Sequence, residues 1–294
     1  MHSNHLFRGI GFALAAALSF AGLGATVKLA SESLSNEMIV FLRNLFGLIV
    51  LAPWLYQSGI GTLATRRFTH HLVRTLFGLA AMYCFFYAIA HLQLAEAVLL
   101  NFSAPLFIPI IALLWLGESV TARLGSAIIV GFLGISLILK PGIGILSSAV
   151  FVGLASGVFA AVAMVSIRRL SDTEPTPRIV FYYAAICTLV SALPLIWSWQ
   201  TPALGALAAM AVGGTFATIG QLCLTHAYAL APAAQIGPYT YATVIFAAAI
   251  GWAIWGEVPD RLTMLGTTLV CIAGILALGL SPKHQATARI TIHE

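Results

Sequence analysis

Long apolar segments, separated by short polar connections, run through nearly the whole chain. Each run is about 20 residues long, the length needed to cross a hydrocarbon layer of about 30 Å. Backbone polar groups in lipid must hydrogen-bond within their own segment, and no segment alternates with the period of a barrel strand. Breaks at glycine, proline and clustered charges predict ten transmembrane helices, at residues 6–30, 37–56, 70–90, 93–116, 122–140, 148–168, 177–198, 204–228, 232–255 and 262–280.

The second half of the chain repeats the first at a nearly constant spacing. The tripeptide IVF at residues 39–41 recurs at 179–181, and Glu118 recurs as Glu257 after 139 residues. The spacing stays between 139 and 141 residues across five successive predicted helices. A spacing this regular predicts that one five-helix unit occurs twice.

The two predicted units, residues 1–144 and 145–294, each contain an odd number of helices. Because every crossing reverses the side of the membrane, the second copy of a five-helix unit must insert upside down. We therefore predict an all-α membrane protein of ten transmembrane helices, arranged as two inverted five-helix repeats. Many secondary transporters have this architecture, with the substrate near the midplane and access alternating between the two sides.

Composition and charge agree with a membrane protein and favour one orientation. Hydrophobic residues make up 60% of the chain and charged residues 8%, whereas ordinary soluble domains carry about 25% charged residues. The net charge of +5 falls between the spans, where insertion topology explains it better than nucleic-acid binding. With both termini in the cytoplasm, ten of the fourteen Lys and Arg residues lie on the cytoplasmic side.

The fourth span and its later counterpart carry the most specific motif. Residues 92–118 read LQLAEAVLLNFSAPLFIPIIALLWLGE, and residues 231–257 read APAAQIGPYTYATVIFAAAIGWAIWGE. With Pro105, the two helix-ending Gly-Glu pairs and Arg43 in the second span, this pattern resembles the EamA family of the drug/metabolite transporter superfamily. Val244 departs from the repeat, because it stands where the counterpart of Pro105 would be.

The resemblance covers nearly the whole chain and implies a carrier of the inner (cytoplasmic) membrane. Members of the family are often exporters of amino acids or other small metabolites. Their central cavity is lined mainly by the first, third, fourth, sixth, eighth and ninth spans. The resemblance therefore implies a small-molecule substrate and the lipid bilayer as partners, in a monomer or homodimer.

Polar and aromatic side chains at helical spacing mark a candidate substrate path. Glu96, Leu100 and Ser103 share one face of the fourth helix, and the repeat places Gln235 and Tyr239 on the equivalent face of the ninth. Polar side chains persist in lipid when they face a watery cavity or a partner helix. The candidate substrate-binding residues are Arg43, Tyr83, Tyr87, Glu96, Leu100, Asn101, Ser103, Gln221, Gln235 and Tyr239.

Several of these residues allow a second interpretation. Glu96 either lies inside its span, where it would bind a substrate amine or a coupling proton, or faces water at the interface. Arg43 either meets a substrate carboxylate or pairs with Glu37 or Glu96. Each tyrosine alone is also typical of interface packing.

Three prolines are candidates for helix bending or gating. Pro105, Pro109 and Pro238 each remove a backbone donor, free carbonyl groups one turn earlier and permit a bend. Structural prolines are also common in membrane helices, so each has a purely structural alternative.

The chain is predicted to be a secondary carrier, without catalytic residues, cofactor or metal. No GxxxxGK[ST] loop occurs, so a proton or other ion gradient, substrate exchange or the substrate's own gradient would supply the energy. The alternative is a membrane-embedded enzyme acting on a lipid or polyprenyl substrate. Its usual clusters of acids and histidines are not evident, since His71 stands with arginines and Glu174 looks like part of a solvated loop.

Overall fold

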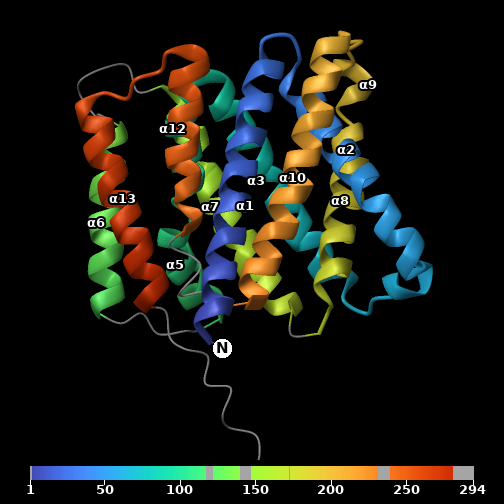
Figure 1. Ribbon diagram of the computed structural model, residues 1–294, viewed down its shortest axis with the longest axis horizontal. Helices are drawn as coiled ribbons and strands as arrows, with labels where there is room; N and C mark the ends of the chain where they lie inside the picture. The colour runs from blue at the N-terminus through green and yellow to red at the C-terminus, as the bar shows by residue number, and fades with distance from the viewer. Residues whose placement is uncertain (1, 117–121, 140–146, 172, 231–238, 281–294) are drawn as a thin grey trace, which may run out of the picture.

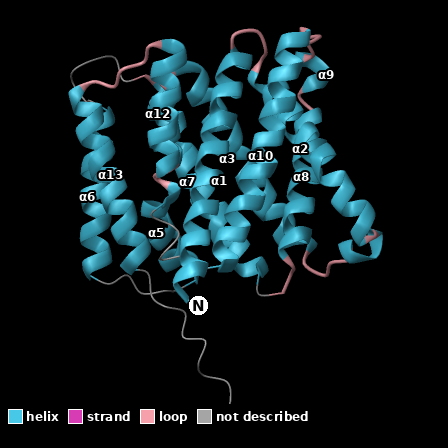
Figure 2. Cartoon of the chain, viewed as in Figure 1, coloured by secondary structure: helices cyan, strands magenta, loops and turns pink. Residues whose placement is uncertain are grey.

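The computed structural model describes residues 2–116, 122–139, 147–171, 173–230 and 239–280 (Figure 1). All regular secondary structure in these residues is helical, as the colouring in Figure 2 shows. The all-helical class predicted from the sequence is therefore confirmed for the described residues. The first half contains α1 (His2–Ser31), α2 (Asn36–Ser58), η1 (Ile60–Leu63), α3 (Phe68–His91), α4 (Leu94–Asn101), α5 (Ala104–Leu116) and α6 (Ala122–Leu139). The second half contains α7 (Ser148–Ser171), α8 (Thr176–Ala192), α9 (Leu195–Ser198), α10 (Leu204–Leu230), α12 (Ala242–Trp255) and α13 (Arg261–Leu280).

Five of the helices are long and apolar enough to cross a membrane. They lie in α1, α2, α3, α7 and α10, and each has an apolar stretch of at least 18 residues. Five shorter apolar helices of 10–17 residues lie between and after them. By length and composition, five helices of the described residues are able to cross a membrane, and the total of ten crossings stays a prediction.

The fourth predicted span consists of two helices rather than one. Helix α4 ends at Asn101, and Ser103 closes the break by donating both its backbone N–H and its hydroxyl to the Leu100 carbonyl, at 3.3 and 2.6 Å. Helix α5 starts at Ala104 and has Pro105 at its second position, where the missing N–H leaves no helical bond unmade. The proline thus coincides with an interruption of the span.

The seventh predicted span, residues 177–198, is also divided, which the sequence prediction did not anticipate. Helix α8 ends at Ala192, and the short α9 begins at Leu195, directly after Pro194. Proline cannot donate a helical hydrogen bond and its ring clashes with the preceding turn, so the helix breaks there. Pro53, its counterpart in the repeat, instead lies inside α2.

The main helix contacts join the two halves of the chain. The most extensive contacts join α1 with α10, α3 with α7, and α6 with α13, which lie side by side in Figure 1. Small residues allow these close approaches. A Cβ on Gly134 would lie 2.8 Å from the carbonyl oxygen of Gly266, so α6 and α13 cross with their backbones nearly touching.

Contacts at the helix ends fix the relative directions of three helices. Lys28, in the last turn of α1, donates to the carbonyl of Leu92, directly after the end of α3. Glu174 follows α7 and accepts a hydrogen bond from Thr65, which precedes α3. Helices α1 and α3 therefore run in the same direction, and α7 runs in the opposite one.

The close crossing of α6 and α13 predicts a stability effect at Gly134. Gly134→Val should lower the free energy of unfolding by about 1–3 kcal/mol, because its branched side chain must push the two helices apart. Thermal unfolding of the purified variant in detergent measures the effect as a lower Tm.

Gly125→Val is the matched control. Gly125 lies on the same helix, and a Cβ added there would have nothing within 4 Å, so the variant carries a similar change in helix propensity without the clash. Equal Tm values for the two variants would contradict the close crossing.

Candidate functional site

A partly buried ion pair joins the C-terminal ends of α1 and α12. The side chains of Lys28 and Glu257 are 14% and 16% exposed, and the ammonium group donates to one carboxylate oxygen. The other carboxylate oxygen accepts the backbone N–H of Leu94 at 2.8 Å, at the start of α4. Glu257 thereby satisfies an N–H group that has no partner within α4, and the dipole of that helix favours the negative charge. We call Lys28, Leu94 and Glu257 the α1–α12 clamp.

The Gly-Glu pair at the end of α12 builds this clamp. Gly256 has a φ of 66°, a left-handed conformation that suits glycine and turns the chain at the end of the helix. One turn earlier, a Cβ on Gly251 would lie 2.7 Å from Oε2 of Glu257, so glycine leaves room for the carboxylate. Glu118, in the first Gly-Glu pair, lies outside the described residues.

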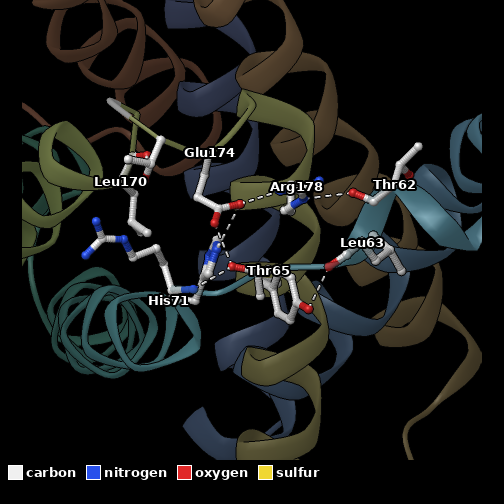
Figure 3. A network of polar contacts seen from close by, with 10 residues as sticks. Thr62, Leu63, Thr65, His71, Leu170, Glu174 and Arg178 are labelled. Carbon is white, nitrogen blue, oxygen red and sulfur yellow. Dashed lines mark hydrogen bonds and ion pairs between the residues drawn. The ribbon is translucent and has the colours of Figure 1, made fainter.

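A second polar cluster joins the halves at the opposite ends of the helices, around Glu174 (Figure 3). Oε1 of Glu174 accepts a hydrogen bond from the Thr65 hydroxyl at 2.7 Å, and Oε2 accepts one from Nη1 of Arg178 at 2.7 Å. Nε2 of His71 lies 3.9 Å from Oε2. Thr65 and His71 belong to the first half, whereas Glu174 and Arg178 belong to the second. We call these four residues the Glu174 clamp.

Neighbouring contacts extend the Glu174 clamp. Nε of Arg178 donates to the Thr62 carbonyl at 2.8 Å, and the Tyr182 hydroxyl donates to the Leu63 carbonyl at 2.9 Å (Figure 3). The Tyr182 ring packs on the His71 ring with centroids 4.5 Å apart. Arg178 and Tyr182 of the second half therefore contact both the end of η1 and the start of α3.

The interpretation of Glu174 as part of a solvated loop was wrong. Glu174 is only 7% exposed and is enclosed by its hydrogen-bond donors. The interpretation failed because the sequence around Glu174 is polar, while its partner Thr65 lies 109 residues away. His71, expected to stand with arginines alone, is fully buried against Tyr182.

The partners of Glu174 control its protonation. Burial raises the pKa of the carboxyl group, but the hydrogen bonds from Thr65 and Arg178, and the charges of Arg178 and His71, outweigh burial. The net result is a pKa below the ordinary value of 4.5. The Glu174 clamp therefore contains a carboxylate at neutral pH.

The predicted face of the fourth span packs against α7. Nδ2 of Asn101 donates to the Ser156 hydroxyl at 3.2 Å. Leu100 and Ser103 are buried against glycines of α7, since a Cβ on Gly153 would lie 2.8 Å from a methyl carbon of Leu100. In this conformation these residues contact protein, and their role in substrate binding stays a prediction.

Glu96 is half-buried and faces α13. Its Oε1 accepts a hydrogen bond from the Thr263 hydroxyl at 3.2 Å, and the backbone N–H of Thr263 donates to Asp260 at 3.0 Å. The predicted neighbours across a cavity were residues of the ninth span. Gln235 and Pro238 of that span lie outside the described residues.

The remaining candidates occupy separate places in the bundle. Tyr87 stacks on His91 with ring centroids 4.1 Å apart, while Tyr83 has a buried hydroxyl without a hydrogen-bond partner. Gln221 and Tyr239 are exposed. For Pro109, the structure describes only its place within α5.

Arg43 has a partner that the sequence did not suggest. Its Nη1 donates to Oδ1 of Asn44 at 2.8 Å, and Nδ2 of Asn44 donates to the Val40 carbonyl at 2.8 Å. Within the described part of the chain, no ion pair joins Arg43 to Glu37 or Glu96. The predicted pairing with either glutamate is therefore not formed.

Arg74 and Tyr183 were missed in the sequence. The guanidinium carbon of Arg74 lies 3.6 Å from the centroid of the Tyr183 ring. Arg74 had been counted only as a charge that sets orientation. The available signal was its position inside a predicted span, at residues 70–90, where a charge is expensive unless it has a function or a partner.

Apolar helices long enough to cross a membrane, with polar contacts between the two halves at both ends of the bundle, indicate a multi-pass membrane protein. The chain belongs to the EamA-like transporter family, which matches residues 7–140 and 147–279. The predicted family is confirmed, and the two matches cover the two halves of the chain. Membership places the protein in the inner membrane.

Three relatives from bacteria are named transporters of small molecules. The pseudopaline exporter CntI of Pseudomonas aeruginosa is 37% identical over 91% of this chain and 94% of its own length. An S-adenosylmethionine uptake transporter of Rickettsia felis is 26% identical, over 95% of this chain and 96% of its own. A riboflavin transporter of Vibrio cholerae is 25% identical, over 92% of each chain.

A crystal structure supports the fold. It aligns with a TM-score of 0.62 at 19% identity, covering 92% of this chain and 96% of the other. At this identity the likeness concerns the fold alone.

The lowered pKa of Glu174 predicts how stability depends on pH. A folded-state pKa below the unfolded value means that the stabilisation is present above the unfolded pKa and is lost as pH falls through the folded pKa. Glu174→Gln should therefore lower the Tm by the same amount from about pH 8 to about pH 5.5, and by less at pH values below the ordinary glutamate range. Thermal unfolding across this range measures the difference.

Glu32→Gln, which changes an exposed carboxylate, should leave the Tm unchanged throughout. A wild-type-to-variant difference that already changes between about pH 8 and about pH 5.5, where histidines titrate, would contradict this account and assign the pH dependence to His71.

Proposed function

We propose that this protein is a secondary exporter of small amphipathic metabolites resembling amino acids, and that it works by alternating access across the inner membrane. The coarser class of small-molecule transporter comes from its family and its relatives. The same relationships argue against the alternative of a lipid-modifying enzyme. In this proposal both termini lie in the cytoplasm, and the protein acts as a monomer or homodimer.

The proposal includes ten crossings in two inverted repeats. Under the repeat, the first and eighth spans correspond to the sixth and third, so an axis relating the halves would exchange the pair α1 and α10 with the pair α7 and α3. These are two of the most extensive contacts in the bundle. The pair α6 and α13, the fifth and tenth spans, would map onto itself. The opposite directions of α1 and α7 agree with the same relation.

The observation that carries the proposal is the pair of polar clamps at opposite ends of the bundle. Each clamp joins residues of the first half to residues of the second. To admit a substrate from one side, the halves must separate at that side, so the clamp there must break. Removing one partner from a buried ion pair costs about 3–5 kcal/mol, but opening a clamp exposes both partners to water and costs much less. Such pairs are suited to gates that open and close.

The cargo and the direction rest on the relatives and on the polar residues of the spans. The relative with 37% identity is named as an exporter, which supports outward movement of a metabolite. Tyr83, Tyr87 and Tyr239 offer apolar area with one hydrogen bond each, which suits an amphipathic molecule. A coupling proton or ion, with Glu96 as its candidate site, belongs to the proposal as well.

Reversible cross-linking of each face tests the mechanism. Nε2 of Gln93 lies 3.5 Å from the carbonyl oxygen of Val258, so Gln93→Cys and Val258→Cys can be joined beside the α1–α12 clamp. Thr62→Cys and Thr173→Cys flank the Glu174 clamp, since the Thr62 carbonyl binds Arg178 and Thr173 precedes Glu174, and both residues are exposed. A flexible bis-methanethiosulfonate reagent would join this pair. The background would have its four native cysteines replaced.

Each cross-link should stop exchange of a labelled amino-acid mixture in proteoliposomes, and reduction should restore it, because both faces must open in every cycle. Each single-cysteine variant, treated with the same reagent, is the control and should remain active. Continued exchange after complete cross-linking at either face would contradict alternating access. Absence of exchange by uncross-linked protein would contradict the proposed cargo.

A further inference from the structure

One arginine side chain stacks on a tyrosine inside the bundle, and a second arginine lies on a helix that contacts both of theirs. Arg43 comes from α2, Arg74 from α3 and Tyr183 from α8, and these three helices contact one another. The guanidinium carbon of Arg74 lies 3.6 Å from the centroid of the Tyr183 ring. We call Arg43, Arg74 and Tyr183 the arginine cluster.

The arginine cluster lies deep in the membrane span. The Arg74 side chain runs along α3 to Gly78, where a Cβ would lie 2.8 Å from Nη1 of Arg74 and 2.9 Å from Cε2 of Tyr183. Gly78 is about 15 Å from the start of a helix about 36 Å long. The guanidinium group is therefore in the middle third of α3, far from both ends. Glycine at this position creates the space in which the cation and the ring meet.

Several buried polar atoms of this region lack hydrogen-bond partners. Nε of Arg43, and Nε and Nη1 of Arg74, are buried without a hydrogen bond, and so are the hydroxyls of Thr75 and Tyr83. Among the described residues, no carboxylate forms an ion pair with either arginine. Glu37, the nearest acid on α2, is six residues from Arg43, or about 9 Å along the helix.

An arrangement of this kind is unstable unless something else supplies negative charge. A cation whose N–H groups are buried without a counter-ion is expensive in a low-dielectric interior, and two cations on contacting helices also repel each other. Ionisable residues inside a membrane span mark functional sites for this reason. Two guanidinium forks with free N–H groups match the geometry of a carboxylate, which accepts paired hydrogen bonds. The Tyr183 ring fixes the plane of the Arg74 guanidinium.

We propose that the arginine cluster binds a carboxylate group of the transported metabolite. The inference rests on the proposed transport function and narrows its substrate class to molecules with at least one carboxylate. A bound carboxylate would neutralise the repulsion between Arg43 of α2 and Arg74 of α3, which both belong to the first half of the chain.

Charge removal separates a binding role from a structural role. In Arg43→Gln and Arg74→Gln, exchange of a labelled amino-acid mixture should fall about tenfold or more, because a charge-assisted bond to the substrate is lost. The Tm of the substrate-free protein should stay the same or rise, because an unpaired buried charge has been removed. Exchange in proteoliposomes and thermal unfolding in detergent measure the two effects.

Substitutions of two further arginines serve as controls for these measurements. Arg178→Gln removes an arginine that is paired with Glu174 and should lower the Tm. Arg66→Gln removes an exposed arginine and should change neither the Tm nor the exchange. If Arg43→Gln and Arg74→Gln lower the Tm as Arg178→Gln does and leave exchange intact, the arginine cluster is structural and the proposal is overturned.

Competition identifies the recognised group. Unlabelled amino acids should inhibit exchange by the wild-type protein, whereas amino-acid amides and inorganic phosphate should not. Equal inhibition by the amides, or inhibition by phosphate, would overturn the assignment to carboxylates. Wild-type exchange that survives both arginine substitutions contradicts this inference alone, whereas a wild-type protein that exchanges no amino acid contradicts the proposed function and the inference together.

Discussion

A charged group inside a membrane must have a partner, and the organisation of this protein follows from where its charges find one. At one end of the bundle, Lys28 and Glu257 neutralise each other, and Glu257 also binds the start of α4. At the other end, Glu174 accepts hydrogen bonds from Thr65 and Arg178 and lies close to His71. Both clamps satisfy their charges by joining the two halves of the chain. Between them lies the arginine cluster, with which no carboxylate of the described residues forms an ion pair.

Helix α4 connects the clamp at one end with the interior. It is eight residues long, is held by Glu257 at its start, and is separated from α5 by the turn before Pro105. Its last residue, Asn101, binds Ser156 of the opposite half. Helix α4 is thus bounded by the α1–α12 clamp at its start and by a break in the span at its end.

The sequence was sufficient to predict the features that arise from local chemistry. Apolar runs predicted the helices, and the repeated motifs predicted the family, because both depend on residues close together in the chain. The sequence did not allow the tertiary contact partners to be predicted. Lys28 and Glu257 are 229 residues apart, and nothing near either residue indicates the other. Arg74 was recognisable as a charge within a span, but its partner Tyr183 was not.

The prolines show the same limit of prediction from sequence. Pro53 and Pro194 occupy matching positions of the repeat, yet the first lies inside α2 and the second separates α8 from α9. The local effect of the ring is the same at both sites, so the surrounding packing decides whether the helix bends or ends. For that reason the break at Pro194 could not be predicted from the chain alone.

The most direct test of the account is the distance between the halves at each face, measured in the same preparation. Spin labels at positions 93 and 258 report on the face with the α1–α12 clamp, and labels at positions 62 and 173 report on the face with the Glu174 clamp. Pulsed electron resonance in liposomes, with and without an amino-acid mixture, gives both distance distributions. We expect one distance to lengthen as the other shortens. Distances that change together, or that stay fixed while exchange proceeds, would contradict the account.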